Sequence, residues 1–169
     1  LEIADHAGRK TTIDLIAGHY ADSAALTPPP DSWAANADHH VNIWTVKIEA
    51  EGEWQLPAHC AGLNRMIYFY RGDQLEIGGK TLTAGHGVVA ISDKTLLFRN
   101  GKQESLLLIL EGKPIAEPVA QHGPFVMNSR EELQATFLDY QRTQFGGWPW
   151  PDQDQVHGAE PVRFARHAD

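Results

Sequence analysis

The chain has 169 residues, of which 42% are hydrophobic and 21% charged, and its formal net charge is −8. This length suits one domain, or one domain with appendages. An acidic chain without a basic block is a poor partner for a phosphate backbone, so we expect no nucleic-acid partner. The longest apolar run, Leu106 to Leu110, is strand-sized, so we expect no membrane partner either.

The single cysteine, Cys60, excludes an internal disulfide and fits a reducing compartment, so we expect a cytoplasmic protein. A lone cysteine at an inward strand position is usually a buried residue and not a nucleophile. We find no nucleophile–base pattern, phosphate loop or pair of carboxylates, and we expect no catalytic residue in this chain. The chain opens at Leu1 without an initiator methionine or a secretion signal, so we expect Leu1 to result from processing or truncation.

Short segments of alternating apolar and polar residues dominate the first two thirds of the chain. In one of them Trp44, Val46 and Ile48 share one face, as side chains of a strand do. Gly78-Gly79 is a two-residue hairpin turn, because both positions tolerate positive φ. Many short strands with turn residues between them predict an all-β sandwich or small barrel, which we place at residues 1–112.

Residues 113–169 are predicted to differ from the rest of the chain. Lys113 to Asn128 has three prolines and is expected to be irregular. Ser129 followed by Glu132 forms a capping box, and apolar residues follow at helical spacing, so we predict a helix over about 129–144. The tail beyond it, which begins with Trp148 and Trp150, has no periodicity and is expected to dock on another surface.

Two short motifs have an ordinary structural interpretation beside a functional one. Arg71-Gly72-Asp73 matches a cell-adhesion tripeptide, but its residues are those that a tight turn requires, and we favour the turn. His39-His40 could contribute to a metal site, but no carboxylate cluster is near in sequence, and we favour a solvated loop end.

Pro57 to Asn64 resembles the first metal motif of cupins, and Gly85 to Ser92 resembles the second. With Gly72 as reference, the inward positions at which cupins carry metal ligands hold other residues, and His59 is expected to face outward. We therefore expect no metal in this chain, whose degenerate ligand positions are Ala58, Cys60, Asn64, Ala90 and Ser92. A residual cavity would be lined by Cys60, Asn64, Tyr68 and His86.

A more specific resemblance lies in the last third of the chain, in Leu110 to Pro114, Gly123-Pro124-Phe125-Val126-Met127-Asn128 and Asp139-Tyr140-Gln141. These residues resemble the C-terminal half of pirin-like proteins, which are bicupins. The resemblance implies a cupin (double-stranded β-helix, jelly-roll) barrel with one C-terminal helix. It also implies a preceding N-terminal barrel, absent from this chain, that holds iron or a similar divalent metal and has quercetin 2,3-dioxygenase activity.

On this resemblance, the chain is expected to be a non-metal cupin domain that packs on that N-terminal barrel. An alternative is a protein-interaction module of a pirin-type transcriptional or metabolic regulator, in which the helix and the tail bind a protein partner. A third possibility is a small-ligand binder that uses the residual cavity.

Overall fold

The computed structural model describes residues 1–148 of the chain. The chain divides into two units, Leu1–Ile115 and Ala116–Asp169. The expected architecture, mostly strands with one C-terminal helix, is confirmed. Each unit is described by itself below.

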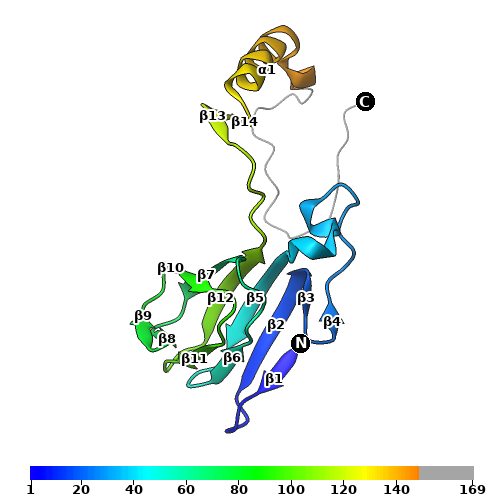
Figure 1. Cartoon of the computed structure of the whole chain (residues 1–169). Helices are drawn as coiled ribbons and strands as arrows, with labels where there is room; N and C mark the ends of the chain where they lie inside the picture. The colour runs from blue at the N-terminus through cyan, green and yellow to red at the C-terminus, as the bar shows by residue number, and fades with distance from the viewer. Residues whose placement is uncertain (149–169) are drawn as a thin grey trace. The chain divides into compact units, whose positions relative to one another are not determined.

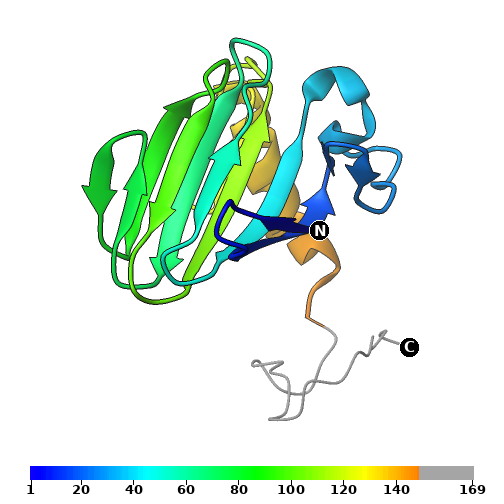
Figure 2. The ribbon, with the colours of Figure 1, turned by 90° about the horizontal axis from the view of Figure 1, so that it is seen from below.

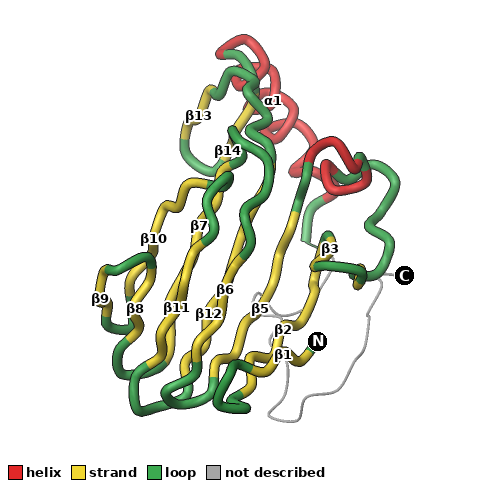
Figure 3. Tube along the Cα trace, turned by 60° about the horizontal axis from the view of Figure 1, so that its bottom comes forward, coloured by secondary structure: helices red, strands yellow, loops and turns green. Residues whose placement is uncertain are grey.

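The first unit contains two antiparallel sheets, whose strands run side by side in Figures 1 and 2. In spatial order, the larger sheet consists of β1 (Glu2–Ala4), β2 (Lys10–Ala17), β5 (Asn42–Ile48), β12 (Ser105–Gly112), β7 (Asn64–Arg71) and β10 (His86–Ile91). The smaller sheet consists of β6 (Glu53–Leu56), β11 (Leu96–Asn100), β8 (Leu75–Ile77) and β9 (Lys80–Leu82). A short hairpin, β3 (His19–Tyr20) and β4 (Ser23–Ala24), and two 3₁₀ turns, Trp33–Ala35 and Ala37–His39, precede β5 (Figure 3).

The core lies between the two sheets, because alternate residues of their strands point to one side. In β5, the predicted face of Trp44, Val46 and Ile48 is confirmed, and all three are at most 4% exposed. Both sheets contribute to one buried apolar cluster: Ile13, Trp44, Val46, Ile48, Ile67, Phe69, Leu107 and Ile109 from the larger sheet, and Trp54, Leu56, Leu75, Ile77 and Phe98 from the smaller. The first unit is therefore a two-layer β-sandwich.

Strand β12 lies at the centre of the larger sheet, between β5 and β7. Its burial alternates strictly, so that Ser105, Leu107, Ile109 and Glu111 all face the core. The inner face of β12 thus ends in a carboxylate, and this position sets the site described below.

Two predicted turns are confirmed. Gly78 and Gly79 join β8 to β9 with φ of 55° and 83°, values that glycine adopts without strain. Arg71 ends β7 and Asp73 follows in a turn, where the Asp73 carboxylate accepts the backbone N–H of Gln74 at 2.8 Å. The Arg71–Asp73 tripeptide is therefore part of a strand connection.

The second unit contains a hairpin of β13 (Ala120–His122) and β14 (Phe125–Met127), followed by α1 (Arg130–Thr143) and a 3₁₀ turn, Gln144–Gly146. The capping box predicted at Ser129 and Glu132 is confirmed. The expectation that residues 113–128 are irregular is wrong for their second half, because the Gly123 turn, with φ of 56°, lets the flanking residues pair as a hairpin. Phe125 of that hairpin packs edge-on against Phe137 of α1 at 4.9 Å.

The predicted docking tail lies mostly outside the described residues, and so does Trp150. Among residues 1–148, no helix is both long enough and apolar enough to span a membrane.

Candidate functional site

The most unusual feature of the first unit is a row of three buried polar side chains at one end of the sandwich. Asn42 of β5, Glu111 of β12 and Arg65 of β7 are direct cross-strand partners. All three lie on the inner face of the sheet, and they are 2%, 5% and 2% exposed. Buried polar groups are costly unless they find partners, so their contacts decide whether this row is stable.

The charges of the row are paired with each other. Nε of Arg65 donates to Oε2 of Glu111, and both side chains are 1% exposed. Nδ2 of Asn42 donates to the other carboxylate oxygen, Oε1, at 3.1 Å. The remaining guanidinium nitrogens of Arg65 lie 3.4 Å from the carbonyl oxygens of Lys94 and Pro57. The ion pair is therefore compensated within the protein, which a buried charge requires.

His59 adds a titratable group to this row. It lies in the loop between β6 and β7, and its Nδ1 is 2.6 Å from Oε1 of Glu111. The His59 side chain is 27% exposed, whereas that of Glu111 is 1% exposed. His59 thus connects a buried carboxylate to the surface, and the expectation that it faces outward is wrong.

Two further histidines surround His59. The ring of His40 lies 4.9 Å from the His59 ring, and the ring of His19 lies 6.3 Å from it, both nearly perpendicular to it. His40 follows the second 3₁₀ turn, and His19 begins β3. Three segments far apart in the sequence therefore bring their histidines together.

A pocket of about 210 Å³ opens beside these groups. Its lining includes His19, His59 and Glu111 together with Tyr20 and Trp44. Nε1 of Trp44 is buried and has no hydrogen-bond partner among the described residues. Because a buried donor without a partner is costly, this indole N–H favours an acceptor, such as water or a ligand oxygen, in or near the pocket.

The degenerate ligand positions are not arranged as the cupin register suggested. Ala58 and Cys60 are exposed and lie outside any strand, so strand alternation does not orient them. Asn64 is also exposed, since the inner face of β7 begins at Arg65. The expected register of β7 is thus wrong by one residue.

The second set of ligand positions agrees better with the expected parity. Ala90 packs against the core from β10, and Ser92 is 3% exposed. Of the residues expected to line a residual cavity, Tyr68 is 40% exposed, and Cys60, Asn64 and His86 are also exposed. The structure does not gather these four side chains in the sandwich interior.

The inner face does not fit the iron centre that a metal-binding cupin carries. Its end is occupied by Arg65, whose guanidinium is cationic and already paired with the Glu111 carboxylate. A cation beside a metal ion is unfavourable, and arginine offers no lone pair to the metal.

Sequence reasoning missed Arg65 and Glu111. A signal was present: Glu111 continues the alternation of Leu107 and Ile109, which places it on the core face. The pairing with Arg65 depends on strand order, which the local pattern does not contain.

Comparison with known proteins places the chain in a family. The model of the pirin C-terminal cupin domain matches residues 43–146. A Vibrio cholerae protein named "putative quercetin 2,3-dioxygenase" is 34% identical over 113 residues, which are 67% of this chain and 34% of that protein. A Pseudomonas aeruginosa protein of the same designation is 35% identical over 129 residues, 76% of this chain and 44% of that protein.

Solved structures give a similar result. The crystal structure of quercetin 2,3-dioxygenase from Acinetobacter baumannii superposes with a TM-score of 0.67 and 25% identity, over 86% of this chain and 47% of that one. The chain thus spans less than half the length of these relatives, and the cupin fold expected from the sequence is confirmed. The chain belongs to the family of pirin C-terminal cupin domains and is related to proteins of the quercetin 2,3-dioxygenase type.

Proposed function

We propose that this chain is the non-metal cupin domain of a longer, cytoplasmic bicupin, whose N-terminal barrel carries a metal-dependent dioxygenase activity of the quercetin 2,3-dioxygenase type. The observation that carries the proposal is the paired Arg65 and Glu111 at the inner end of the sandwich. That pair fills the end of the inner face with a cation and a carboxylate that already satisfy each other, and the relatives are more than twice as long as the stretch that they share with this chain. The chemistry would therefore belong to the other barrel.

In this role the domain supports the metal barrel by packing against it. The outer face of the larger sheet offers a groove of about 460 Å³, lined chiefly by apolar side chains that include Ile43, Met66, Val89 and Leu110. Val89 is 79% exposed and its neighbour Ile91 is 68% exposed. A contiguous exposed apolar patch of this kind is typical of an interface. Because the relatives are more than twice as long as the stretch that they share with this chain, the N-terminal barrel is the partner that we place on this patch.

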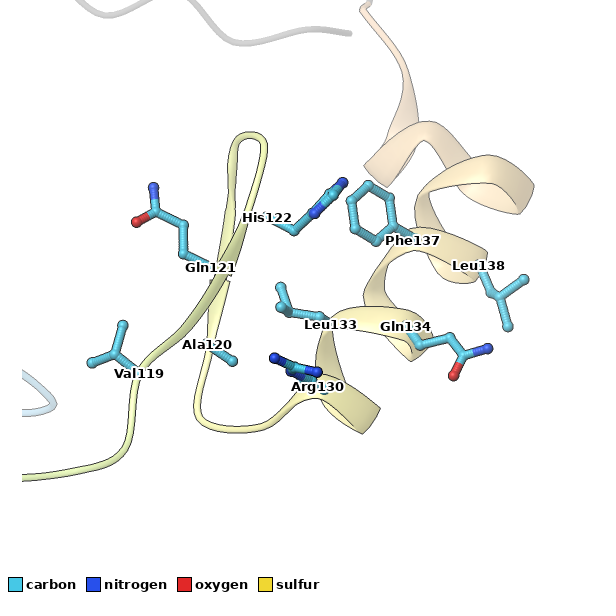
Figure 4. Close-up of a pocket in the computed structure, with 9 residues that line it drawn as sticks. All are labelled: Val119, Ala120, Gln121, His122, Arg130, Leu133, Gln134, Phe137 and Leu138. Carbon is cyan, nitrogen blue, oxygen red and sulfur yellow. The ribbon is translucent and has the colours of Figure 1, made fainter.

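A second candidate function is a protein-interaction module, and the second unit favours it. A groove of about 670 Å³ lies between the β13–β14 hairpin and α1. In Figure 4, His122 of the hairpin points toward Phe137 of α1, and the two rings make an edge-on contact with centroids 5.5 Å apart. Leu133 points toward the hairpin, whereas Leu138 points away. Val119 at its rim is 75% exposed, so the groove offers an apolar contact to a protein partner.

The activity is tested by oxygen consumption with quercetin. The 169-residue chain incubated with iron and quercetin should consume no dioxygen above a control of free iron with quercetin. The longer protein, with its N-terminal barrel and iron, should consume it. Turnover by the 169-residue chain alone would overturn the assignment of roles.

The two surfaces are separated by two matched substitutions, each of which places a carboxylate on an exposed valine. If the outer face of the sheet binds the N-terminal barrel, V89D should abolish binding of a separately produced barrel in calorimetry, and V119D should leave it unchanged. The reverse result would place the barrel on the hairpin–helix groove. Equal binding by both variants and the unchanged chain would contradict both placements.

A further inference from the structure

We propose that His40, His59 and Cys60 form a zinc site on the surface of the first unit, separate from the metal of any N-terminal barrel. Each of the three residues offers a ligand atom, and these atoms all lie within 4.8 Å of one another. His40 and His59 are half-buried and Cys60 is exposed, so an ion can reach them from solvent. The sequence predicted no metal here, because Cys60 was expected on a strand and His40 at a solvated loop end. In the structure both residues lie outside any strand, and their ligand atoms lie within 4.8 Å of each other and of that of His59.

The backbone around His59 and Cys60 is held by Ser92. The N–H of His59 donates to the carbonyl oxygen of Ser92 at 2.8 Å. The Ser92 hydroxyl donates in turn to the carbonyl oxygen of Cys60, also at 2.8 Å. Ser92 therefore holds the backbone at two successive candidate ligands before any ion binds, which lowers the ordering cost of binding.

The backbone around His40 is also held by hydrogen bonds. His40 ends the second 3₁₀ turn in the left-handed region, with φ of 50° and ψ of 39°. The N–H of His40 donates to the carbonyl oxygen of Ala37. The N–H of Lys113, just after β12, donates to the carbonyl oxygen of His39 at 2.8 Å. A non-glycine residue in this conformation is uncommon and is often associated with a functional constraint.

Glu111 gives His59 the orientation of a metal ligand. Because Nδ1 of His59 is engaged by the Glu111 carboxylate at 2.6 Å, Nε2 is the nitrogen left for an ion. Histidines that bind metals almost always give their other nitrogen to a carboxylate, a carbonyl or water, which fixes the ring and raises its basicity. The buried carboxylate, itself held by Arg65 and Asn42, is such a partner.

His39 and His40 are neighbours in sequence, but only His40 belongs to the proposed zinc site. Both ring nitrogens of His39 have partners: Nδ1 lies 2.6 Å from the carbonyl oxygen of Trp33, and Nε2 lies 3.4 Å from Nδ2 of Asn36. Its ring also stacks on Trp33 at 3.4 Å. His39 is thus a structural residue of the loop, and His40 is the member of the pair that is directed to His59.

The donor set fits zinc. One thiolate and two imidazoles are ligands of intermediate softness, and zinc sites with three protein ligands keep a fourth position for water. Bond lengths of about 2.0–2.1 Å to nitrogen and 2.3 Å to sulfur place tetrahedral ligand atoms about 3.3–3.6 Å apart. Because 4.8 Å is the upper limit of their separations, the ligand atoms would have to approach one another by no more than about 1.5 Å on binding. Rotation of the exposed Cys60 side chain can supply part of this approach.

The test is metal binding by the untagged 169-residue chain. Equilibrium dialysis should show one zinc ion per chain. Cobalt, as a spectroscopic substitute, should give the intense near-ultraviolet band of a thiolate–cobalt bond together with the visible bands of a tetrahedral ion.

Two variants at the surface carry the comparison. C60S should remove the thiolate–cobalt band, and H40N, which keeps a side chain suited to the left-handed backbone, should weaken binding. Since loss of an outer partner of a metal ligand already costs 10–100-fold, loss of either ligand should cost at least about 100-fold in zinc affinity. The matched control is H86Q, which removes an exposed histidine whose Nδ1 bonds to the carbonyl oxygen of Thr83, and it should bind zinc as the unchanged chain does.

Absence of stoichiometric zinc, a cobalt spectrum without the thiolate band, or unchanged affinity in C60S and H40N would each overturn the site. Circular dichroism shows whether the variants remain folded. Because the assay uses neither quercetin nor iron, its failure is distinguishable from failure of the proposed dioxygenase role.

Discussion

Two neighbouring rows on the inner face of the larger sheet differ completely in chemistry. Each row runs across β5, β12 and β7, and the two rows are two residues apart along each strand. The apolar row consists of Trp44, Ile109 and Ile67, and the polar row consists of Asn42, Glu111 and Arg65. Both rows are almost fully buried. An apolar row is stabilised by the area that it removes from water, whereas each group of a polar row depends on its partners. The two rows should therefore respond differently to substitution.

The largest effect is expected from breaking the buried ion pair. R65M leaves the Glu111 carboxylate buried without its cation, and it should lower the free energy of unfolding by about 3–5 kcal/mol. Urea denaturation followed by circular dichroism measures this loss. The control is the double variant R65M/E111L, which removes both charges and should regain most of the stability. A single variant within about 1 kcal/mol of the unchanged chain would show that the pair is not buried as described.

The apolar row provides the next comparison. I109A removes a fully buried side chain and leaves a cavity, so it should destabilise the chain by about 2–5 kcal/mol. L108A, one residue earlier and on the half-buried outer face, should cost less in the same urea titration. E111L should rescue R65M because it removes the charge that R65M leaves unpaired. I109A leaves a cavity and no unpaired charge, so removal of a neighbouring side chain should not rescue it. Equal losses at Ile109 and Leu108 would contradict the assignment of inner and outer faces.

Asn42 tests how strongly the polar row is coupled. N42A removes the donor to Glu111 and the side-chain oxygen that accepts the N–H of His19 at 3.0 Å. It should cost about 1–3 kcal/mol, because buried groups are left without a partner. In combination with R65M its effect should be non-additive by about 0.5–3 kcal/mol, as for residues of one network. Additive losses would indicate three independent positions.

The two rows also differ in how much of them the sequence predicts. Alternation in β5 correctly indicated that Trp44, Val46 and Ile48 face the core, because an apolar period of two has one interpretation in a half-buried strand. The Gly78-Gly79 turn and the capping box at Ser129 were also predictable, since each depends on residues adjacent in sequence. The domain family followed from the block around Gly123 to Asn128.

The polar row and the histidine cluster could not be predicted in the same way. Arg65 and Glu111 are 46 residues apart, and only the strand order makes them partners. The metal-motif register failed for a related reason: Ala58, His59 and Cys60 lie in a loop, where period-two alternation has no meaning. Arg65 therefore occupies the inner position expected of Asn64. Non-local pairing and loop conformation are the parts of this site that a single sequence leaves undetermined.

The smallest expected effect lies beyond the opposite end of β7, where a carboxylate is exposed and held by backbone groups. Asp73 accepts N–H groups from Gln74, Lys102 and Gln103, and these hydrogen bonds lower its pKa below the ordinary 3.8. A pKa that is lower in the folded state contributes stability above the unfolded pKa, and the contribution is lost as pH falls through the folded value.

D73N should therefore lower the melting temperature slightly at pH 7, and the difference from the unchanged chain should shrink below about pH 3.8. An exposed group is well solvated, so the effect should be far smaller than that of R65M, in which the carboxylate left behind is buried. Melting temperatures of both variants measured between pH 7 and pH 3 would establish the order. A D73N effect as large as that of R65M would mean that burial does not distinguish the two carboxylates, and the contrast between the buried row and the exposed turn would fail.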